Sequence, residues 1–191
     1  MSESGGFRRL SESKVHQGYV WHVATAEYEA PDGTRFSRDI VRSPGAVGVV
    51  PLVFDVEGNA SVVLVAQYRP PYEQVVIEIP AGMRDIAGED TAEVARRELI
   101  EEAGLVAGEL VLLAAIYPSP GMTDSITSLY LATNCTPTAT DRHGPEEDHM
   151  EILHLPLSDA LSMIESGEIC DAKTVSALLL TARRLRSADS S

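Results

Sequence analysis

Cysteine is scarce in this sequence of 191 residues, which contains only Cys135 and Cys170. The two do not form a CxxC pair, so the sequence offers neither a disulfide framework nor a zinc motif, and it suits a reducing compartment. Long apolar runs are also missing. The N-terminus lacks the apolar region of a signal peptide, and no later stretch approaches the roughly 20 apolar residues of a membrane span. We therefore expect a soluble, cytoplasmic protein that has no membrane partner.

Basic residues are few as well. Fifteen lysines and arginines stand against 29 aspartates and glutamates, which gives a formal net charge of -14. A surface of this sign repels nucleic acid and anionic membranes, so we expect no nucleic-acid partner. A polyanionic substrate would need metal ions or a local basic patch. Hydrophobic residues make up 44% of the chain, which is enough for a sizeable buried core.

The first part of the chain predicts a small β arm. Residues 1–16 are polar, and we expect them to be loosely held. Residues 18–29 alternate in part between apolar and polar side chains, and the turn sequence PDGT returns the chain as a second strand at 35–41. An SPG sequence then breaks the pattern. We therefore divide the chain into an arm at 1–45 and a mixed α/β domain at 46–191.

The mixed domain contains several apolar runs that read as buried strands. The predicted strands are 46–54, 61–67, 75–79, 110–117, 126–133 and 152–155. Between the third and fourth of them, the sequence predicts a helix at 91–103. Asp90 or Thr91 can cap its N-terminus, and Gly104 is suited to end it in a left-handed conformation.

The last part of the chain predicts a long loop followed by two helices. Residues 136–149 are polar and rich in acidic side chains, so we expect an exposed loop. Ser158 can cap a helix that ends near Gly167, and Asp171 can cap the last helix. The apolar stripe of that last helix consists of Val175, Leu178, Leu179, Ala182 and Leu185.

The sequence RRELIEEAG at 96–104 gathers three glutamates, Glu98, Glu101 and Glu102, on the first helix. Residues three and four positions apart share a helix face, so these like charges repel. One interpretation is an ordinary solvated face with two arginines as counter-charges. The other is a site for a hard divalent cation, which prefers carboxylate and carbonyl oxygens. The glycine loop directly before the helix can supply a carbonyl and favours the cation site. In either case we expect the glutamates to be exposed.

From Gly82 to Leu105 the sequence resembles the Nudix box, G-x5-E-x7-R-E-U-x-E-E-x-G-U, in which U is apolar. The match is complete from Glu89 onward, but six residues instead of five separate Gly82 from Glu89. The resemblance implies an α/β fold, the Nudix α/β/α sandwich with a mixed sheet, to which this chain would add an antiparallel N-terminal β arm.

The same resemblance implies a role for each residue of the box. Two or three Mg²⁺ or Mn²⁺ ions would be held on a diphosphate. Their ligands would be Glu98, Glu101, Glu102 and the backbone carbonyl of Ala81. Glu89 and Arg97 would pair to fix the loop against the helix.

Outside the box, most of residues 17–187 look like the ADP-ribose pyrophosphatase branch of the Nudix family. The arm sequence GYVWHV, the motifs QYRPP and EIPAGM, and a proline sixteen residues after Gly104 carry this resemblance. The implied substrate-binding residues are Tyr19, Arg38, Arg69, Glu78, Gly82, Met83 and Pro120. Tyr19 would stack on adenine, with a half-buried strand aromatic as the alternative. Pro120 could equally be a plain turn proline.

A general base is implied on the loop before the last strand. Aligned on Met150, the matching residue is Glu146, with Glu147 and Asp148 as close alternatives. A loop carboxylate can approach the attacking water when substrate is bound. If none of these acts, Glu101 in the box is the remaining catalytic candidate.

The implied activity is metal-dependent hydrolysis of ADP-ribose to AMP and ribose 5-phosphate. Two alternatives are hydrolysis of another nucleoside-diphosphate sugar and non-hydrolysing ADP-ribose sensing. The sensor is disfavoured because all three box glutamates are present and no basic DNA-binding segment is seen. The branch also implies a homodimer in which the arm is exchanged between subunits.

Overall fold

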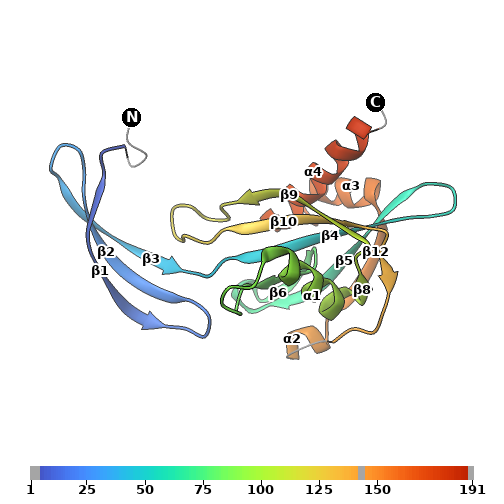
Figure 1. Cartoon of the computed structure of the whole chain (residues 1–191), viewed down its shortest axis with the longest axis horizontal. Helices are drawn as coiled ribbons and strands as arrows, with labels where there is room; N and C mark the ends of the chain where they lie inside the picture. The colour runs from blue at the N-terminus through green and yellow to red at the C-terminus, as the bar shows by residue number, and fades with distance from the viewer. Residues whose placement is uncertain (1–4, 142–144, 189–191) are drawn as a thin grey trace. The chain divides into compact units, whose positions relative to one another are not determined.

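The computed structural model describes residues 5–141 and 145–188, and the chain forms two compact units. The first consists of Met1–Gly45 and Tyr117–Ile126, and the second of Ala46–Ile116 and Thr127–Ser191. Figure 1 labels most of the helices and strands of both units. None of the helices in the described ranges is long and apolar enough to cross a membrane.

The first unit contains an antiparallel sheet. Its strands are β1 (Arg8–Gln17), β2 (His22–Glu29) and β3 (Arg35–Arg42), in that order across the sheet. The turn predicted between β2 and β3 is confirmed, because the Ala30 N–H donates to the Thr34 carbonyl at 2.8 Å. The expectation that residues up to 16 are loosely held was wrong for β1. This strand is mostly exposed on both faces, so it carries no apolar alternation that a sequence pattern could reveal.

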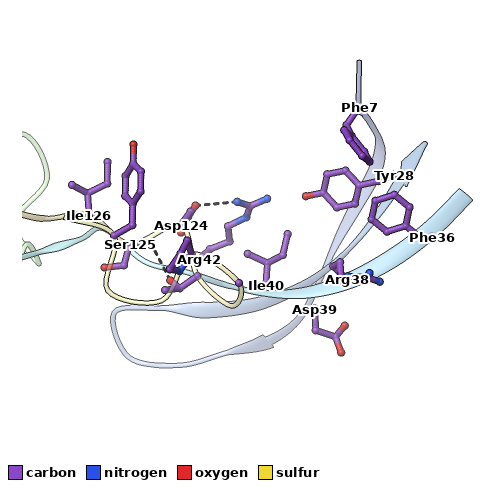
Figure 2. A pocket seen from close by; sticks show the side chains of 14 residues that line it. Phe7, Tyr28, Phe36, Arg38, Asp39, Ile40, Arg42, Asp124, Ser125 and Ile126 are labelled. Atoms are coloured by element: carbon purple, nitrogen blue, oxygen red, sulfur yellow. Dashed lines mark hydrogen bonds and ion pairs between the residues drawn. The ribbon is translucent and has the colours of Figure 1, made fainter. Parts of the chain in front are cut away.

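The segment Tyr117–Ile126 folds against β3 within the first unit. The Val41 N–H donates to the Met122 carbonyl at 2.9 Å. Arg42 reaches the same segment, with its Nη1 3.0 Å from Asp124 Oδ2 (Figure 2). The loop that contains the proline expected to mark the substrate class is therefore held by the arm.

The second unit is built on a mixed sheet. Its strands are β4 (Ala46–Phe54), β5 (Ala60–Arg69), β6 (Gln74–Glu78), β7 (Ala81–Met83), β9 (Glu109–Ile116), β10 (Thr127–Thr133) and β12 (Glu151–Pro156). The order is β12-β5-β4-β10-β9, with β6 added to β5 and β7 to β4. Only the β4–β10 pairing is parallel among the described strands. Two short strands, β8 (Leu105–Val106) and β11 (Thr136–Pro137), pair separately.

Helices cover both faces of this sheet (Figure 1). They are α1 (Thr91–Ala103), α3 (Leu157–Ser166) and α4 (Ala172–Ala188), with a one-turn α2 (Pro145–Asp148) and the 3-10 helix η1 (Pro70–Tyr72) at the edges. On one face α1 packs its buried Leu99 with Val47 and Val63. On the other face α4 packs Leu178 with Leu64. The predicted α/β/α sandwich with a mixed sheet is confirmed.

Several local predictions near the C-terminus need correction. Ser158 does not cap α3, which begins one residue earlier after Pro156 and has no side-chain cap. Leu179 is 51% exposed, because the buried face of α4 passes through Ala177 and Thr181 instead. The predicted loop at 136–149 contains β11 and α2. The cap at Asp171 is confirmed, since its Oδ2 accepts from the Thr174 N–H at 3.0 Å.

Candidate metal and phosphate site

The local sequence places the carboxylates of α1 in register. Asp90 caps the helix by accepting from the Ala92 N–H at 2.8 Å, and Gly104 ends it at φ +62°. Between these signals the helix runs without interruption, so Glu98 and Glu102 lie one turn apart on the same face. That face is turned toward β7, which contacts α1.

The two glutamates are buried, contrary to the expectation of an exposed face. Glu98 is 7% and Glu102 is 4% exposed. The backbone of β7 covers them: the Ala81 N–H donates to Glu102 Oε2 at 2.7 Å. Gly82 packs on Glu98 so closely that a Cβ at this position would lie 2.1 Å from Glu98 Cδ. Glycine is required here for this close approach of backbone to carboxylate, and no side chain would fit.

Burial and mutual repulsion disturb the ionisation of both carboxyls. Desolvation, reinforced by the charges of Glu101 and Glu147 and opposed by Arg97, raises the pKa of Glu98 to about 7. Desolvation also raises the pKa of Glu102 to about 8, against the stabilising N–H of Ala81. Both groups thus hold protons near neutral pH when no cation is present. A divalent cation would favour their ionised forms.

Arg97 is the main counter-charge on this part of the helix. Its Nη1 lies 2.9 Å from Glu98 Oε1 and 3.0 Å from Glu101 Oε2. Its Nη2 lies 3.6 Å from Glu89 Oε2, the partner expected from the box. The sequence did not suggest that the same arginine would also contact two of the expected metal ligands.

The donor set fits a hard divalent cation in its chemistry. Mg²⁺ and Mn²⁺ prefer carboxylate and carbonyl oxygens as ligands. The site supplies buried carboxylates with raised pKa values, packed against a glycine that leaves no room for a side chain. Within 5–141 and 145–188, however, no three Asp, Glu, His or Cys side chains are arranged around one point. Arg97 lies among these carboxylates and engages Glu98 Oε1 and Glu101 Oε2, two oxygens that could otherwise bind a cation.

The loop expected to supply the base comes close to this site through Glu147. This residue lies in α2, and its charge raises the pKa of both Glu98 and Glu102. Electrostatic coupling of this kind requires proximity, so Glu147 lies near the buried pair. Glu146 belongs to the same helix, but its side chain lies outside the described part of the structure. Asp148 is exposed.

Arg69 and Glu78 form a partly buried ion pair beside the carboxylate site. Arg69 donates from Nε to Oε1 at 2.7 Å and from Nη2 to Oε2 at 2.8 Å. Lys173 donates to the same carboxylate and to Asp171 Oδ2 at 3.0 Å. Burial opposes ionisation of Glu78, yet the two cations lower its pKa below the ordinary value. The contact of Lys173 with Glu78 was not predicted. A lysine in the first turn of a helix indicates no particular role unless its distant partner is known.

The remaining predicted substrate residues are divided between the two units. Met83 lies in β7 of the second unit and is half-buried. Arg38 and Pro120 line a cavity of about 660 Å³ in the first unit. Figure 2 shows the rings of Phe7, Tyr28 and Phe36 grouped at one end of this cavity. Tyr19 is 97% exposed on the β1–β2 turn and is not among the residues that line it.

Comparison with known proteins identifies the family. Residues 42–178 match the NUDIX domain. The chain belongs to the NUDIX family. An ADP-ribose pyrophosphatase of Bacillus subtilis (strain 168) is 34% identical over 171 residues, which cover 90% of each chain. A GDP-mannose pyrophosphatase of Citrobacter koseri is 33% identical over 75% of this chain and 80% of its own. A crystal structure of an ADP compounds hydrolase superposes with a TM-score of 0.82 at 26% identity and covers 95% of both chains.

The NUDIX match contains the whole carboxylate site and leaves out most of the arm. Glu98, Glu102 and Glu147 lie within residues 42–178, as do Arg69 and Lys173. The arm strands β1 and β2 precede the matched range. The carboxylate site thus belongs to the NUDIX domain, whereas the arm is an addition to it.

The raised pKa values of this NUDIX site predict an unusual dependence of stability on pH. The native, metal-free protein keeps protons on Glu98 and Glu102 up to about pH 7 and 8, whereas the ordinary glutamate pKa is 4.5. The unfolded chain therefore binds fewer protons, and stability falls as pH rises from about 5 to 8. We expect the free energy of unfolding, measured by urea titration with a chelator present, to fall by at least about 2 kcal/mol between about pH 5 and 8. Each pKa unit corresponds to about 1.4 kcal/mol.

The net charge of the chain could produce a similar trend, so the control is Glu102→Gln, which removes one of the two groups. Its stability should depend less on pH than that of the wild type. Parallel pH profiles for the two proteins would contradict the assignment of the trend to these carboxyls. Saturating Mg²⁺ should flatten the wild-type profile, because the ion stabilises the ionised forms.

Proposed function

We propose that this NUDIX protein hydrolyses ADP-ribose to AMP and ribose 5-phosphate with the help of Mg²⁺ or Mn²⁺. The observation that carries the proposal is the buried pair Glu98 and Glu102, which Glu147 approaches from α2. Such a pair is costly in a purely structural role, because burial raises both pKa values and the like charges oppose each other. Relatives named ADP-ribose pyrophosphatase support the choice of substrate.

Each residue has a distinct task in this reaction. Glu98, Glu102, Glu101 and the carbonyl of Ala81 would hold two or three divalent ions. When bound, such ions neutralise the diphosphate oxygens and favour attack by water on phosphorus. Glu147 accepts the proton of the attacking water. The water oxygen bonds to one phosphorus while the bond from that phosphorus to the bridging oxygen breaks. The bridging oxygen leaves with the other phosphate, which can take up the proton that Glu147 received.

Arg69 is proposed to bind the anionic part of the substrate. Glu78 engages its Nε and Nη2 in a bidentate pair and thereby fixes the plane of the guanidinium. Nη1 makes no hydrogen bond to a described residue, and the side chain is 36% exposed. This nitrogen can therefore donate to a phosphate or ribose oxygen. Gly82 and Met83 would border the substrate, and Glu89 would support Arg97, as the resemblance implies.

The test is product analysis with a panel of nucleotide sugars in the presence of Mg²⁺ or Mn²⁺. ADP-ribose should be cleaved with the highest kcat/KM, and the products should be AMP and ribose 5-phosphate. Performing the reaction in H₂¹⁸O shows which product carries the label and hence which phosphorus is attacked. GDP-mannose is the principal competitor, because relatives named GDP-mannose pyrophosphatase cover three quarters of the chain. If kcat/KM is higher for GDP-mannose than for ADP-ribose, GDP-mannose is the preferred substrate and the proposal is wrong.

We further propose that two chains associate through the arm and that Tyr19 and Arg38 serve the partner's adenine site. The arm exposes apolar side chains that a lone unit has little means to bury: Tyr19 is 97%, Val15 60% and Phe7 50% exposed. Pro120 would act from the same unit. A cytoplasmic location is proposed from the scarcity of cysteine.

We expect light scattering to give twice the mass of one chain. Exchange of the arm predicts more. A mixture of Tyr19→Ala and Glu102→Gln proteins, unfolded and refolded together, should regain part of the wild-type activity at low ADP-ribose concentration. A heterodimer with exchanged arms contains one site that has both Tyr19 and Glu102 intact. Each variant refolded alone is the control. A fully active monomer, or a mixture that is no more active than its parts, would contradict the proposal.

A further inference from the structure

The segment Glu78–Gly82, which leads from β6 to β7, brings backbone groups to the carboxylate site. Its Ala81 N–H binds Glu102 Oε2 at 2.7 Å, and its Pro80 carbonyl accepts from the Val49 N–H at 2.9 Å. At the start of the segment, the Ile79 N–H donates to Thr174 Oγ1 at 2.9 Å. The segment is therefore held by β4, by α1 and by the first turn of α4.

Thr174 is the contact from α4, and it is completely buried. Its hydroxyl accepts a hydrogen bond from the Ile79 N–H and donates one to Asp171 Oδ2 at 2.6 Å. Because the hydroxyl proton is engaged by Asp171, the oxygen is oriented to accept from Ile79. Asp171 is fixed in turn by the Thr174 N–H at 3.0 Å. A helix cap that ordinarily serves its own helix here orients a hydroxyl toward the segment between β6 and β7, 95 residues away in the sequence.

Lys173, the neighbour of Thr174, holds the same segment through a side chain. Its Nζ lies between Glu78 Oε2 and Asp171 Oδ2. Glu78 also receives the bidentate contact of Arg69, whose charge lowers the pKa of Glu102. The first turn of α4 thus fixes both the side chain of Glu78 and the backbone of the next residue.

We propose that Asp171, Lys173 and Thr174 are positioning residues for the divalent-ion site. They touch none of the expected ligand side chains. By holding Glu78 and Ile79, they set the place of Ala81, whose N–H binds one carboxylate oxygen of Glu102 and whose carbonyl is an expected ligand. The inference rests on the proposed function in that Glu102 and Ala81 are taken as ligands. Groups that orient ligands typically change metal affinity by about 10- to 100-fold when removed.

The decisive variant is Thr174→Val, which keeps the shape of the side chain and removes the hydroxyl. We expect faster amide hydrogen exchange at Ile79 and Ala81 in the metal-free protein, and Mn²⁺ binding that is about 10- to 100-fold weaker. Thr174→Ser, which keeps the hydroxyl, should restore most of the affinity. Thr181→Val is the matched control. Thr181 is also fully buried on α4, but its hydroxyl has no hydrogen-bond partner in the described ranges, so its removal should leave Mn²⁺ affinity unchanged.

The outcomes separate this inference from the proposed function. If the wild type binds Mn²⁺ but does not cleave ADP-ribose, the substrate is wrong and the Mn²⁺ titrations still decide the positioning role. If Thr174→Val matches the wild type in Mn²⁺ affinity and Ala81 exchange, positioning is overturned whatever the substrate. Equal weakening by Thr174→Val and Thr181→Val would also overturn it, because the effect would then follow from any change within α4. A wild type that binds no Mn²⁺ would overturn both.

Discussion

Glu102→Gln is expected to reduce kcat for ADP-ribose by about 10³-fold or more at saturating Mg²⁺, since divalent ions contribute several kcal/mol to such a transition state. The variant keeps the size of the side chain and an oxygen that can accept from the Ala81 N–H, which binds Glu102 at 2.7 Å. It loses the negative charge that a divalent ion requires. Because burial raises the pKa of Glu102 to about 8, ionisation of this group costs the metal-free protein stability. The variant should therefore unfold at a higher temperature than the wild type at pH 8 without metal.

The combination of lost activity and gained stability distinguishes a functional carboxylate from a structural one. Glu93→Gln is the control, because Glu93 lies on the same helix, is 66% exposed and pairs only loosely with Arg96 at 3.8 Å. That change should affect neither kcat nor the unfolding temperature appreciably. Near-normal turnover of Glu102→Gln at saturating Mg²⁺ would show that the carboxylate pair is not the metal site. A marked loss of stability would show that Glu102 is mainly structural.

Local signals were sufficient to predict the helix that carries these carboxylates. The structure begins α1 at Thr91 after the Asp90 cap and ends it before Gly104, as the sequence indicated. Both ends depend on hydrogen bonds within a few residues, so the pattern contains all the information needed. The burial of Glu98 and Glu102 depends instead on β7, which approaches the helix from a position earlier in the chain. A helical charge pattern looks the same whether solvent or another strand covers it.

The same reasoning explains what was missed around Glu78. Lys173 lies 95 residues from the carboxylate it contacts, and nothing in the residues adjacent to either one links the two. Thr174 reads as an ordinary residue of a first helical turn until its contact with Ile79 is known. By contrast, the resemblance had already singled out Arg69 and Glu78 as substrate-binding residues, and the structure pairs the two side chains with each other. Their bidentate contact is not a direct cross-strand pair, because Arg69 lies opposite Gln74 and Glu78 lies opposite Val65 in the β5–β6 ladder. Strand alternation and spacing therefore give no sign of it.

The location of Glu147 changes which loop residue is expected to be the general base. The sequence alignment favoured Glu146, but it left its neighbours open. The charge of Glu147 acts on both Glu98 and Glu102, so this carboxylate lies near the two proposed metal ligands. The box glutamates are committed to metal in the proposed mechanism and are poor proton acceptors. A separate carboxylate is then needed, and Glu147 is the one that the described structure brings close.

Glu147→Gln is therefore expected to lower kcat by about 10²- to 10⁴-fold, the usual effect of losing a general base, with little change in KM. The measurement is single-turnover hydrolysis of ADP-ribose at fixed Mg²⁺. Asp148→Asn is the matched control, since it removes a carboxylate from the adjacent, exposed position of α2 and should cost little. Glu146→Gln completes the series. If it alone is impaired, the alignment was right and the base belongs to Glu146. If all three variants remain active, the proton of the attacking water must be accepted by a residue of the Nudix box, and Glu101 is the remaining candidate.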